Sequence, residues 1–492
     1  MIAFVMSQVR KISAKRAMQG YALAAILVLQ AQGLLGQSLY PRAPDVIPGT
    51  LKEMRTVEFW LARMERPDEV IRNLAEIREM NEAYQQKMGD IPRFVSGLDE
   101  DLAEQFITQF VRSPGLEAVM PKIGAQAPSE ISATVKDLVR RQIQHLEGRQ
   151  YGNRLAVEYS SAQIEDLVGE FAESALPAEI KPASGIVVQN SLLKMVPTIH
   201  PEHTGLSQAG KSRWDLWNLD VVKIGSPIRI LHKSKSGGHL LVLSERGYGW
   251  IESKDVALTT AAKAKSFSEA QNFIVVIGDR VPFYASHEAT YVSGWLRMGD
   301  RLPLVETDDN GQRQVMVPVR KTNGEFVTEV AWLAPDADVH SGYLPYTRKN
   351  VVTQSFKLLD NVYDWTGGWF GRNHATSLRD IFSTFGFELP ANGVFIAQFN
   401  DGIKLLPKEQ SKEDRYKTIF TSEPFLTFIT SASGHSELYL GNHYGQVITF
   451  DTHGYGYENE SGEILEIRRW GVSTLELPAY MLKQDILLTQ MR

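Results

Sequence analysis

The side chains best suited to catalysis or metal binding lie in three places in the last third of the chain. His374 follows a loop rich in glycine and tryptophan and opens a segment whose apolar residues keep helical spacing as far as Phe385. His435 begins an alternating stretch typical of a β-strand, and Asp451 and His453 end the next such stretch. Two imidazoles and a carboxylate can transfer protons, and they can also hold a first-row metal ion with open positions.

The start of the predicted helix is a place where a fold can hold a nucleophile. Unpaired N–H groups and the positive end of the helix dipole stabilise an anion there. The junction reads Asn373-His374-Ala375, and the chain contains no cysteine at all. Thr376 and Ser377 lie further along the helix and point elsewhere, so neither is a substitute nucleophile. Thiol chemistry, disulfides and cysteine metal sites are therefore excluded.

This loop and helix resemble the active-site segment of the NlpC/P60 cysteine peptidases, which cleave peptidoglycan stem peptides. In that family the junction carries Asp-Cys-Ser, with the cysteine as nucleophile. The matching residues here are Asn373, His374 and Ala375, and Tyr363 matches the family's loop tyrosine near the nucleophile. The resemblance implies substrate-binding positions at Tyr363, Asn373 and Ala375. Asn373 carries no charge for the substrate's free α-amine, and Ala375 offers no hydroxyl.

The resemblance continues in the strands that follow. His435 matches the general-base position in the family pattern Gly-His-x-x-x-Tyr-Leu-Gly. The family's third residue, which orients that imidazole, falls on the next strand, where Asp451 or His453 could fill it. A carboxylate at Asp451 is able to orient an imidazole.

Two functions follow from this comparison. The family's reaction is hydrolysis of the bond between γ-D-glutamyl and a diamino acid in murein peptides. Because three adjacent junction residues have changed, we expect a catalytically degenerate member that binds cell-wall peptide or a partner without cutting. The alternative is an active murein hydrolase that uses a metal held by His374, His435 and Asp451 or His453. The sequence leaves open whether the chain is an enzyme, and it implies no resident cofactor.

The N-terminus, residues 1–38, is predicted to be an export signal. Basic residues between positions 10 and 16 precede an apolar core from Tyr21 to Leu29. This core is shorter than the roughly 20 apolar residues that span a bilayer, although a retained anchor is the alternative. Leu34-Leu35-Gly36 resembles a lipobox, but Gln37 stands where lipidation needs cysteine. The missing cysteines fit natural loss and deliberate replacement equally. We expect an exported protein of a bacterial periplasm or cell envelope.

Residues 39–180 are predicted to be helical. Apolar residues keep helical spacing over 59–64 and again over 70–77, with Pro67 opening a new helix or turn between them. This stretch of sequence resembles the N-terminal stabilising segment of one multidomain NlpC/P60 group.

Residues 181–260 and 261–340 are predicted to form two SH3-like β-barrels. The first resembles a bacterial SH3-type module, and its alternating apolar residues fit half-buried antiparallel strands. Trp250 is more typical of a core than of a ligand platform. In the second, Asp308-Asp309-Asn310-Gly311 is predicted to be a hairpin loop.

Residues 341–492 resemble the papain-like NlpC/P60 peptidase domain, which makes the predicted fold class α+β. A chain of 492 residues with 43% hydrophobic composition can bury several cores. The net charge of -6 argues against nucleic-acid binding. The expected partners are peptidoglycan peptides or an exported protein, without a stable transmembrane span.

Overall fold

The computed structural model describes most of the chain outside its N-terminus. The described residues are 44–89, 126–146, 151, 158–201, 215, 217–364, 370–390, 393–400, 402–452, 456–459, 461–462, 464–477 and 481–492. The predicted export signal lies outside them. The chain divides into two compact units, of which residues 46–454 and 468–492 form the larger. In the smaller unit the structure describes a hairpin of β21 (Gly456–Glu458) and β22 (Ile464–Glu466). The larger unit holds every element discussed below.

Among the described residues of the predicted helical segment, most lie in helices. Its helices are η1 (Lys52–Arg55), α2 (Val57–Leu61), α3 (Leu74–Gly89), α6 (Pro128–Leu146), α7 (Ser161–Glu170) and η2 (Glu173–Ala175). The expected helical continuation over 70–77 is wrong in its first half. Val70–Arg72 form strand β1, which pairs with β16 (Tyr346–Thr347). The helix begins only at Leu74, because the Asn73 side chain accepts the N–H groups of Ala75 and Glu76 as an N-cap.

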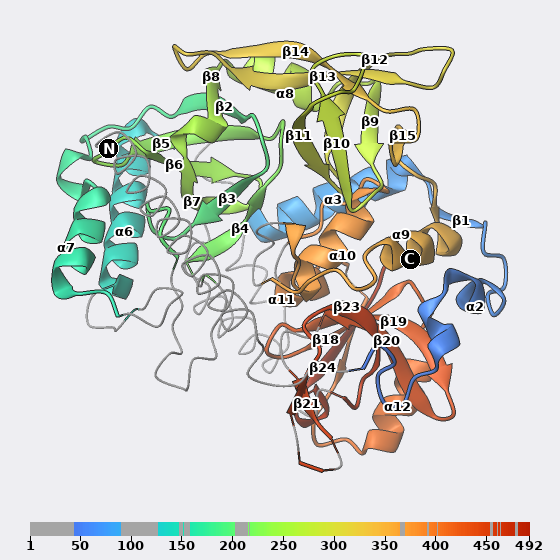
Figure 1. Cartoon of the computed structure of the whole chain (residues 1–492). Helices are drawn as coiled ribbons and strands as arrows, with labels where there is room; N and C mark the ends of the chain where they lie inside the picture. The colour runs from blue at the N-terminus through green and yellow to red at the C-terminus, as the bar shows by residue number, and fades with distance from the viewer. Residues whose placement is uncertain are drawn as a thin grey trace, which may run out of the picture. The chain divides into compact units, whose positions relative to one another are not determined.

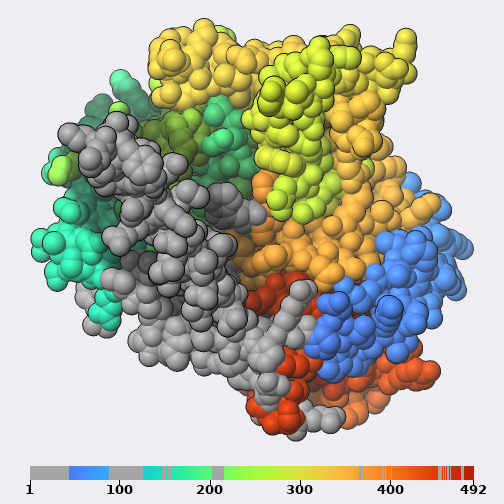
Figure 2. Space-filling view, in the orientation of Figure 1, coloured from blue at the N-terminus to red at the C-terminus, as the bar shows by residue number. Residues whose placement is uncertain are grey.

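This segment packs directly on the C-terminal part of the chain. The Trp60 ring lies edge-on to Phe425, with 5.7 Å between ring centroids. Asn81 Nδ2 donates to Gly386 O at 2.9 Å. In the space-filling view the blue surface of residues 44–89 accordingly lies against the orange and red surface of the C-terminal part (Figure 2). The segment therefore contributes to the same hydrophobic core as the predicted peptidase domain.

A seven-stranded antiparallel sheet occupies the region of the first predicted barrel, in the order β4-β3-β7-β6-β5-β2-β8. Its strands are β2 (Ala183–Val187), β3 (Ser191–Lys194), β4 (Asn218–Val222), β5 (Pro227–Lys233), β6 (His239–Ser244), β7 (Gly247–Glu252) and β8 (Val256–Thr259), with η4 (Ser253–Asp255) before the last. Trp250 is fully buried and its Nε1 donates to Gln142 Oε1 of α6, so it is a core residue as predicted. Between its outermost described strands, β4 and β8, no pairing closes the sheet, and the SH3-like barrel stays a prediction.

A second seven-stranded antiparallel sheet follows helix α8 (Ala261–Ser268), in the order β11-β10-β14-β13-β12-β9-β15. Its strands are β9 (Phe273–Val276), β10 (Arg280–Tyr284), β11 (Val292–Arg297), β12 (Arg301–Thr307), β13 (Arg313–Arg320), β14 (Phe326–Leu333) and β15 (Val339–Ser341). The predicted hairpin loop joins β12 to β13, and Gly311 takes the positive φ of 84° that this turn requires. Here too the outermost described strands stay unpaired with each other.

The C-terminal part is a six-stranded antiparallel sheet with helices on both faces (Figure 1). Its strands, in spatial order, are β17 (Ile403–Leu406), β24 (Ile486–Gln490), β18 (Thr427–Ser431), β19 (Ser436–His443), β20 (Gln446–Thr452) and β23 (Trp470–Thr474). Its helices are α9 (Arg348–Lys357), α10 (His374–Ser383), α11 (Gly393–Ala397), α12 (Lys412–Phe420) and η6 (Met481–Lys483). The mixed α and β content agrees with the predicted fold class.

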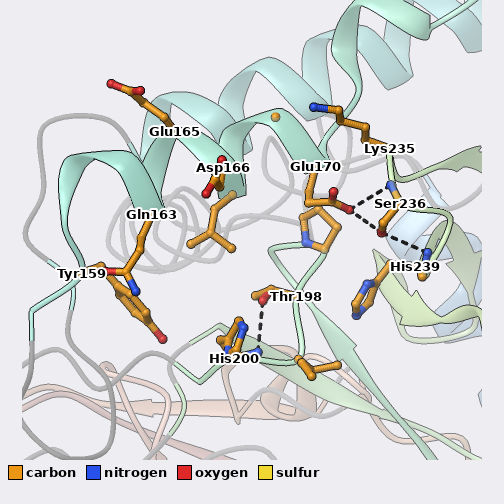
Figure 3. Close-up of a pocket in the computed structure, with 15 residues that line it drawn as sticks. Tyr159, Gln163, Glu165, Asp166, Glu170, Thr198, His200, Lys235, Ser236 and His239 are labelled. Carbon is orange, nitrogen blue, oxygen red and sulfur yellow. Dashed lines mark hydrogen bonds between the residues drawn. The ribbon is translucent and has the colours of Figure 1, made fainter.

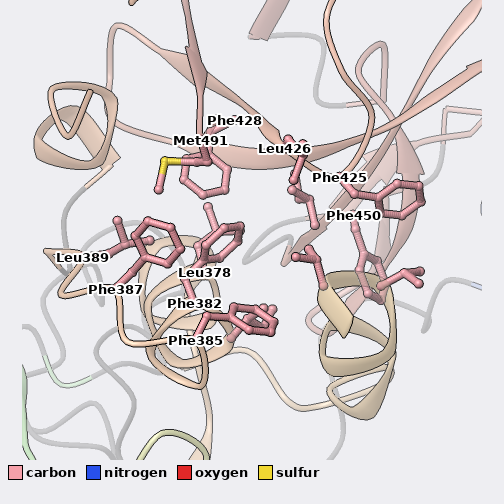
Figure 4. Packing of buried hydrophobic residues seen from close by; sticks show 14 of the residues in the cluster. Leu378, Phe382, Phe385, Phe387, Leu389, Phe425, Leu426, Phe428, Phe450 and Met491 are labelled. Carbon is pink, nitrogen blue, oxygen red and sulfur yellow. The ribbon is translucent and has the colours of Figure 1, made fainter. Parts of the chain in front are cut away.

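Helix α10 lies on one face of this sheet because its apolar stripe is buried there. Phe382 meets Phe428 of β18 edge-on, with 4.9 Å between ring centroids. The surrounding hydrophobic cluster includes Leu378, Phe385 and Phe450, and Figure 4 shows how the side chains of this cluster pack. Helix α12 buries Tyr416 and Ile419 against the opposite face. Among the described helices, none combines the length and apolar composition of a membrane span.

Candidate active site

A capping box fixes the start of α10 at His374. Asn373 Oδ1 accepts the N–H of Thr376 at 2.8 Å, and Thr376 Oγ1 accepts the N–H of Asn373 at 2.9 Å. The Asn373 side chain thus caps the helix, as an asparagine at this position commonly does. Ala375 is buried in the core, and so is Ser377, which is therefore no substitute nucleophile. Of the predicted junction, Asn373 and His374 keep partly exposed side chains.

His374 lies against the second predicted histidine. The two imidazole centroids are 4.6 Å apart. His374 Nδ1 accepts the backbone N–H of Ser436 at 3.2 Å. Burial, with a contribution from His435, lowers the pKa of His374 to about 3, so its ring is neutral near pH 7. A neutral ring that accepts at Nδ1 carries its proton on Nε2, so it has no second lone pair to act as a nucleophile.

His435 lies against Asp451, which is one of the two predicted candidates for the residue that orients its imidazole. His435 Nε2 donates to Asp451 Oδ2 at 2.7 Å. Burial lowers the pKa of His435 to about 3, which also keeps this imidazole neutral. Asp451 is completely buried on β20, the strand next to β19. The other candidate, His453, lies outside the described residues.

Glu437 is a site residue that sequence reasoning missed. Its Oε1 lies 3.7 Å from His435 Nε2, and its side chain is completely buried. Leu438 pairs with Phe450, so the register places Glu437 across from Asp451 on the adjacent strand. Burial and the neighbouring Asp451 raise the pKa of Glu437 well above its usual range. The available signal was the spacing His435-x-Glu437, which puts both side chains on one side of a strand.

Tyr363 lies beside the junction as a packed residue. It is 7% exposed, and its backbone forms a β-bridge with Arg372 just before α10. Its N–H donates to Arg468 O at 3.1 Å. The tryptophans that follow it in the loop lie outside the described residues. The buried ring therefore offers little surface to a ligand.

Comparison with solved structures places this geometry in a known fold. An NlpC/P60 endopeptidase from Photobacterium damselae subsp. piscicida superimposes with a TM-score of 0.67 at 16% identity, covering 92% of this chain and 99% of its own. The chain has the NlpC/P60 endopeptidase fold. An NlpC/P60 family protein from Bacillus cereus ATCC 10987 covers 63% of this chain and 100% of its own, with a TM-score of 0.43 and 13% identity. No family model and no curated protein sequence matches the chain.

In this NlpC/P60 fold a buried ionic network sets the position of α10. Asp380, in the middle of the helix, accepts from Arg297 Nε at 2.5 Å and from Arg372 Nε at 2.9 Å. Lys223 Nζ lies 3.4 Å from its other oxygen. Burial alone would raise the pKa of Asp380, but these cations hold it well below its usual range. The carboxylate therefore stays charged inside the protein.

The same ionic network extends to both seven-stranded β-sheets that precede the C-terminal part. Arg379 Nη1 donates to Asp220 Oδ1 of β4 at 2.5 Å, and Arg297 ends β11 of the second sheet. The turn after β11 approaches the helix so closely that a Cβ at Gly299 would lie 1.7 Å from Ser383 Oγ. Both sheets thus help to fix the helix that presents His374.

A hollow lies between α7 and the first sheet, away from His374 (Figure 3). Its volume is about 530 Å³. Several of its polar groups already bind one another: Glu170 Oε2 accepts from Ser236 Oγ at 2.6 Å, and Thr198 Oγ1 accepts the N–H of His200 at 3.0 Å. Glu165 and Asp166 on its rim are exposed. This hollow lacks the convergent buried groups found beside His374.

Proposed function

We propose that this chain is an NlpC/P60-type protein of the bacterial envelope that binds murein stem peptides without cleaving them. The observation that carries the proposal is His374 at the start of α10, in the nucleophile's place, beside an oriented His435–Asp451 pair. The family's fold and general-base pair support a site for the same class of peptide. The missing thiol supports the loss of its hydrolysis.

The local chemistry argues against acyl transfer by the residues present. A cysteine peptidase needs a thiolate, an imidazole that generates it and a group that orients the imidazole. His435 and Asp451 are suited to the last two roles. His374 cannot take the first, because its Nδ1 lone pair accepts the Ser436 N–H. Asn373 is occupied in capping the helix, so it is poorly placed to bind a substrate amine.

The proposed location follows from the N-terminal sequence. We infer export to the periplasm or cell envelope, where murein peptides are present. The ligand is then a stem peptide containing the γ-D-glutamyl-diamino acid bond. An exported protein partner is the other ligand that the degenerate site could accept.

Incubation of the purified protein with muropeptides, with and without a chelator, tests the loss of hydrolysis. Unchanged peptide in both samples is expected, by chromatography. Cleavage abolished by the chelator would instead favour the alternative, a metal-dependent murein hydrolase. Cleavage that resists the chelator would contradict both functions.

Retention on insoluble murein tests binding. We expect the wild-type protein to co-sediment and His374→Ala to co-sediment less. His287→Ala is the matched control, because it removes an exposed imidazole from the region of the second sheet. Absence of wild-type retention would contradict peptide binding and leave a protein partner to be sought. Equal retention of the two variants would place any binding surface away from α10.

A further inference from the structure

We propose that His435, Glu437 and Asp451 form a binding site for one divalent first-row transition-metal ion of the zinc class. Each residue offers one ligand atom, and these atoms lie within 4.8 Å of one another. The site does not depend on the proposed murein binding, because it rests only on the side chains of β19, β20 and the residue before β19.

The separations of the three ligand atoms suit a small ion after modest adjustment. His435 Nε2 is 2.7 Å from Asp451 Oδ2 and 3.7 Å from Glu437 Oε1. Tetrahedral zinc with bonds of about 2.0–2.1 Å places its ligand atoms roughly 3.3 Å apart. Shifts of less than about 1 Å at the ligand atoms reach this geometry. His435 would then ligate through Nε2 and carry its proton on Nδ1.

The unsatisfied carboxylate is the stronger argument. Neither oxygen of Glu437 makes a hydrogen bond of ordinary geometry within the described part of the chain. The side chain is completely buried and stands beside a second buried carboxylate, Asp451. Two buried carboxyl groups this close require a shared proton or a cation, because like charges in a low-dielectric environment repel strongly. A divalent cation would neutralise both and give Glu437 a stronger partner than the neighbouring Thr449 side chain provides.

The ligand set selects a class of metal. One imidazole nitrogen and two carboxylate oxygens suit zinc and its neighbours, whereas calcium takes six to eight oxygen ligands. The described residues leave space beside the cluster, since Gly471 pairs with Asp451 and none of them lies within 4 Å of a Cβ built there. That space can hold the ion or a water molecule that completes its coordination.

His374 is a neighbour of this site and not one of its ligands. Its Nδ1 already accepts the Ser436 N–H. The metal set expected from sequence was His374, His435 and either Asp451 or His453, and the proposed set replaces His374 with Glu437 and takes Asp451. The revised set comes from two adjacent strands of a rigid sheet, so it needs no movement of α10.

Zinc binding by the full chain tests the proposal. The protein is treated with EDTA, freed of chelator and titrated with zinc chloride in competition with a chromophoric chelator. We expect one zinc per chain, and at least about tenfold weaker binding in Glu437→Gln and in Asp451→Asn, since even outer partners of a metal are worth 10–100-fold. Glu476→Gln is the control, because it neutralises a carboxylate of the same domain that pairs with Lys412. Its affinity should equal that of the wild type.

Cobalt substitution gives a readout independent of affinity. Cobalt in this site should produce visible d–d absorption in the wild type and lose it in Glu437→Gln. Should Glu437→Gln fail to fold by circular dichroism, His435→Gln gives the same test at a ligand that is 12% exposed.

Absence of stoichiometric zinc binding by the wild type would overturn the proposal. So would unchanged affinity in Glu437→Gln, equal loss in Glu476→Gln, or binding of calcium or magnesium in preference to zinc. Murein retention is measured without added zinc, so the two proposals can fail separately.

Discussion

Two buried polar clusters adjoin α10, and they differ in how their charges are balanced. In the middle of the helix, Asp380 faces the cations Arg297, Arg372 and Lys223. Beside the N-terminal end, Glu437 faces another carboxylate, Asp451. The first cluster holds the helix in place. The second contains the hydrogen-bonded His435–Asp451 pair.

The difference indicates that the charge of Asp380, which positions α10, is balanced by cations, whereas the carboxyl groups of Glu437 and Asp451 face each other and no Lys or Arg among the described residues pairs with Glu437. Buried charge is tolerated in a fold when it is paired and hydrogen-bonded. An unpaired buried carboxylate costs free energy of folding, and such cost is typical of functional sites. The contrast yields four predictions, given from the largest expected effect to the smallest.

Replacing Asp380 with asparagine should be the most damaging change. It leaves Arg297 and Arg372 buried without their shared carboxylate. Breaking a buried ion pair from one side costs about 3–5 kcal/mol of unfolding free energy, which urea denaturation would measure. Asp309→Asn, in the exposed hairpin loop, is the control and should change stability by less than about 0.5 kcal/mol. A loss below about 1 kcal/mol for Asp380→Asn would show that the network is not what holds α10.

Asp300 should make the stability of the network depend on pH. It is completely buried, and burial raises its pKa from 3.8 to about 6 although Lys223 opposes this. Between these values the folded protein holds a proton that the unfolded chain has released, so stability falls as pH rises from about 4 to 6. The fall amounts to at most about 3 kcal/mol. Asp300→Asn should abolish it, while its amide oxygen still accepts the Arg297 N–H that Asp300 accepts at 2.7 Å.

Urea denaturation of both proteins at several pH values checks this slope. A wild-type curve that coincides in shape with that of Asp300→Asn over pH 4 to 6 would contradict it.

Glu437→Gln should stabilise the metal-free protein at pH 7 to 8. Because the pKa of Glu437 is raised well above its usual range, the carboxyl group takes up a proton on folding that the unfolded chain has lost at this pH, and the uncharged glutamine avoids that cost. We expect a gain of about 1–3 kcal/mol in the presence of EDTA, measured by thermal or urea unfolding. Glu476→Gln should give no gain, since it removes an ion pair with Lys412. A destabilised Glu437→Gln protein would mean that Glu437 has a partner that the carboxyl form needs.

His374→Cys should create an activated thiol. The variant places a thiol at a helix N-terminus, which lowers a thiol pKa, beside His435, whose neutral imidazole can accept the thiol proton. Alkylation should be about tenfold faster than that of a free thiol at the same pH. Lys412→Cys is the matched control, because it places a thiol at the first position of α12 instead. It should react at an intermediate rate, so the difference between the variants measures the contribution of His435.

Hydrolysis by His374→Cys alone should stay weak, because substrate positioning is missing and its loss can remove orders of magnitude in rate. The triple change Asn373→Asp, His374→Cys, Ala375→Ser should cleave muropeptides measurably faster. A folded triple variant with neither an activated thiol nor cleavage would show that this junction is wrongly assigned.

Local patterns were enough to predict much of this arrangement. Helical spacing after His374 and alternation after His435 predicted α10 and β19, and these two elements bring the imidazoles together. The residue that orients His435 could not be chosen from the sequence. The choice between Asp451 and His453 depends on the register between two strands, which alternation does not give. Asp451 lies at hydrogen-bond distance from His435.

Long-range partners could not be predicted in the same way. Arg379-Asp380 was visible as a charged pair in an otherwise apolar helix, but its partners Asp220 and Arg297 lie 159 and 83 residues away. The two SH3-like barrels stay a prediction for a similar reason, because closure depends on pairing between the first and last strands, which alternation does not reveal. The break before α3 was missed because Asn73 acts as a cap, which periodicity alone does not reveal.

The capping box at Asn373 and Thr376 has an evolutionary consequence. Aspartate caps a helix about as well as asparagine, so exchange between them at position 373 leaves the start of α10 intact. A junction with aspartate at this position and one with asparagine are therefore both expected to fold. Under the proposed function, evolution could therefore change this position of the site without a loss of folding.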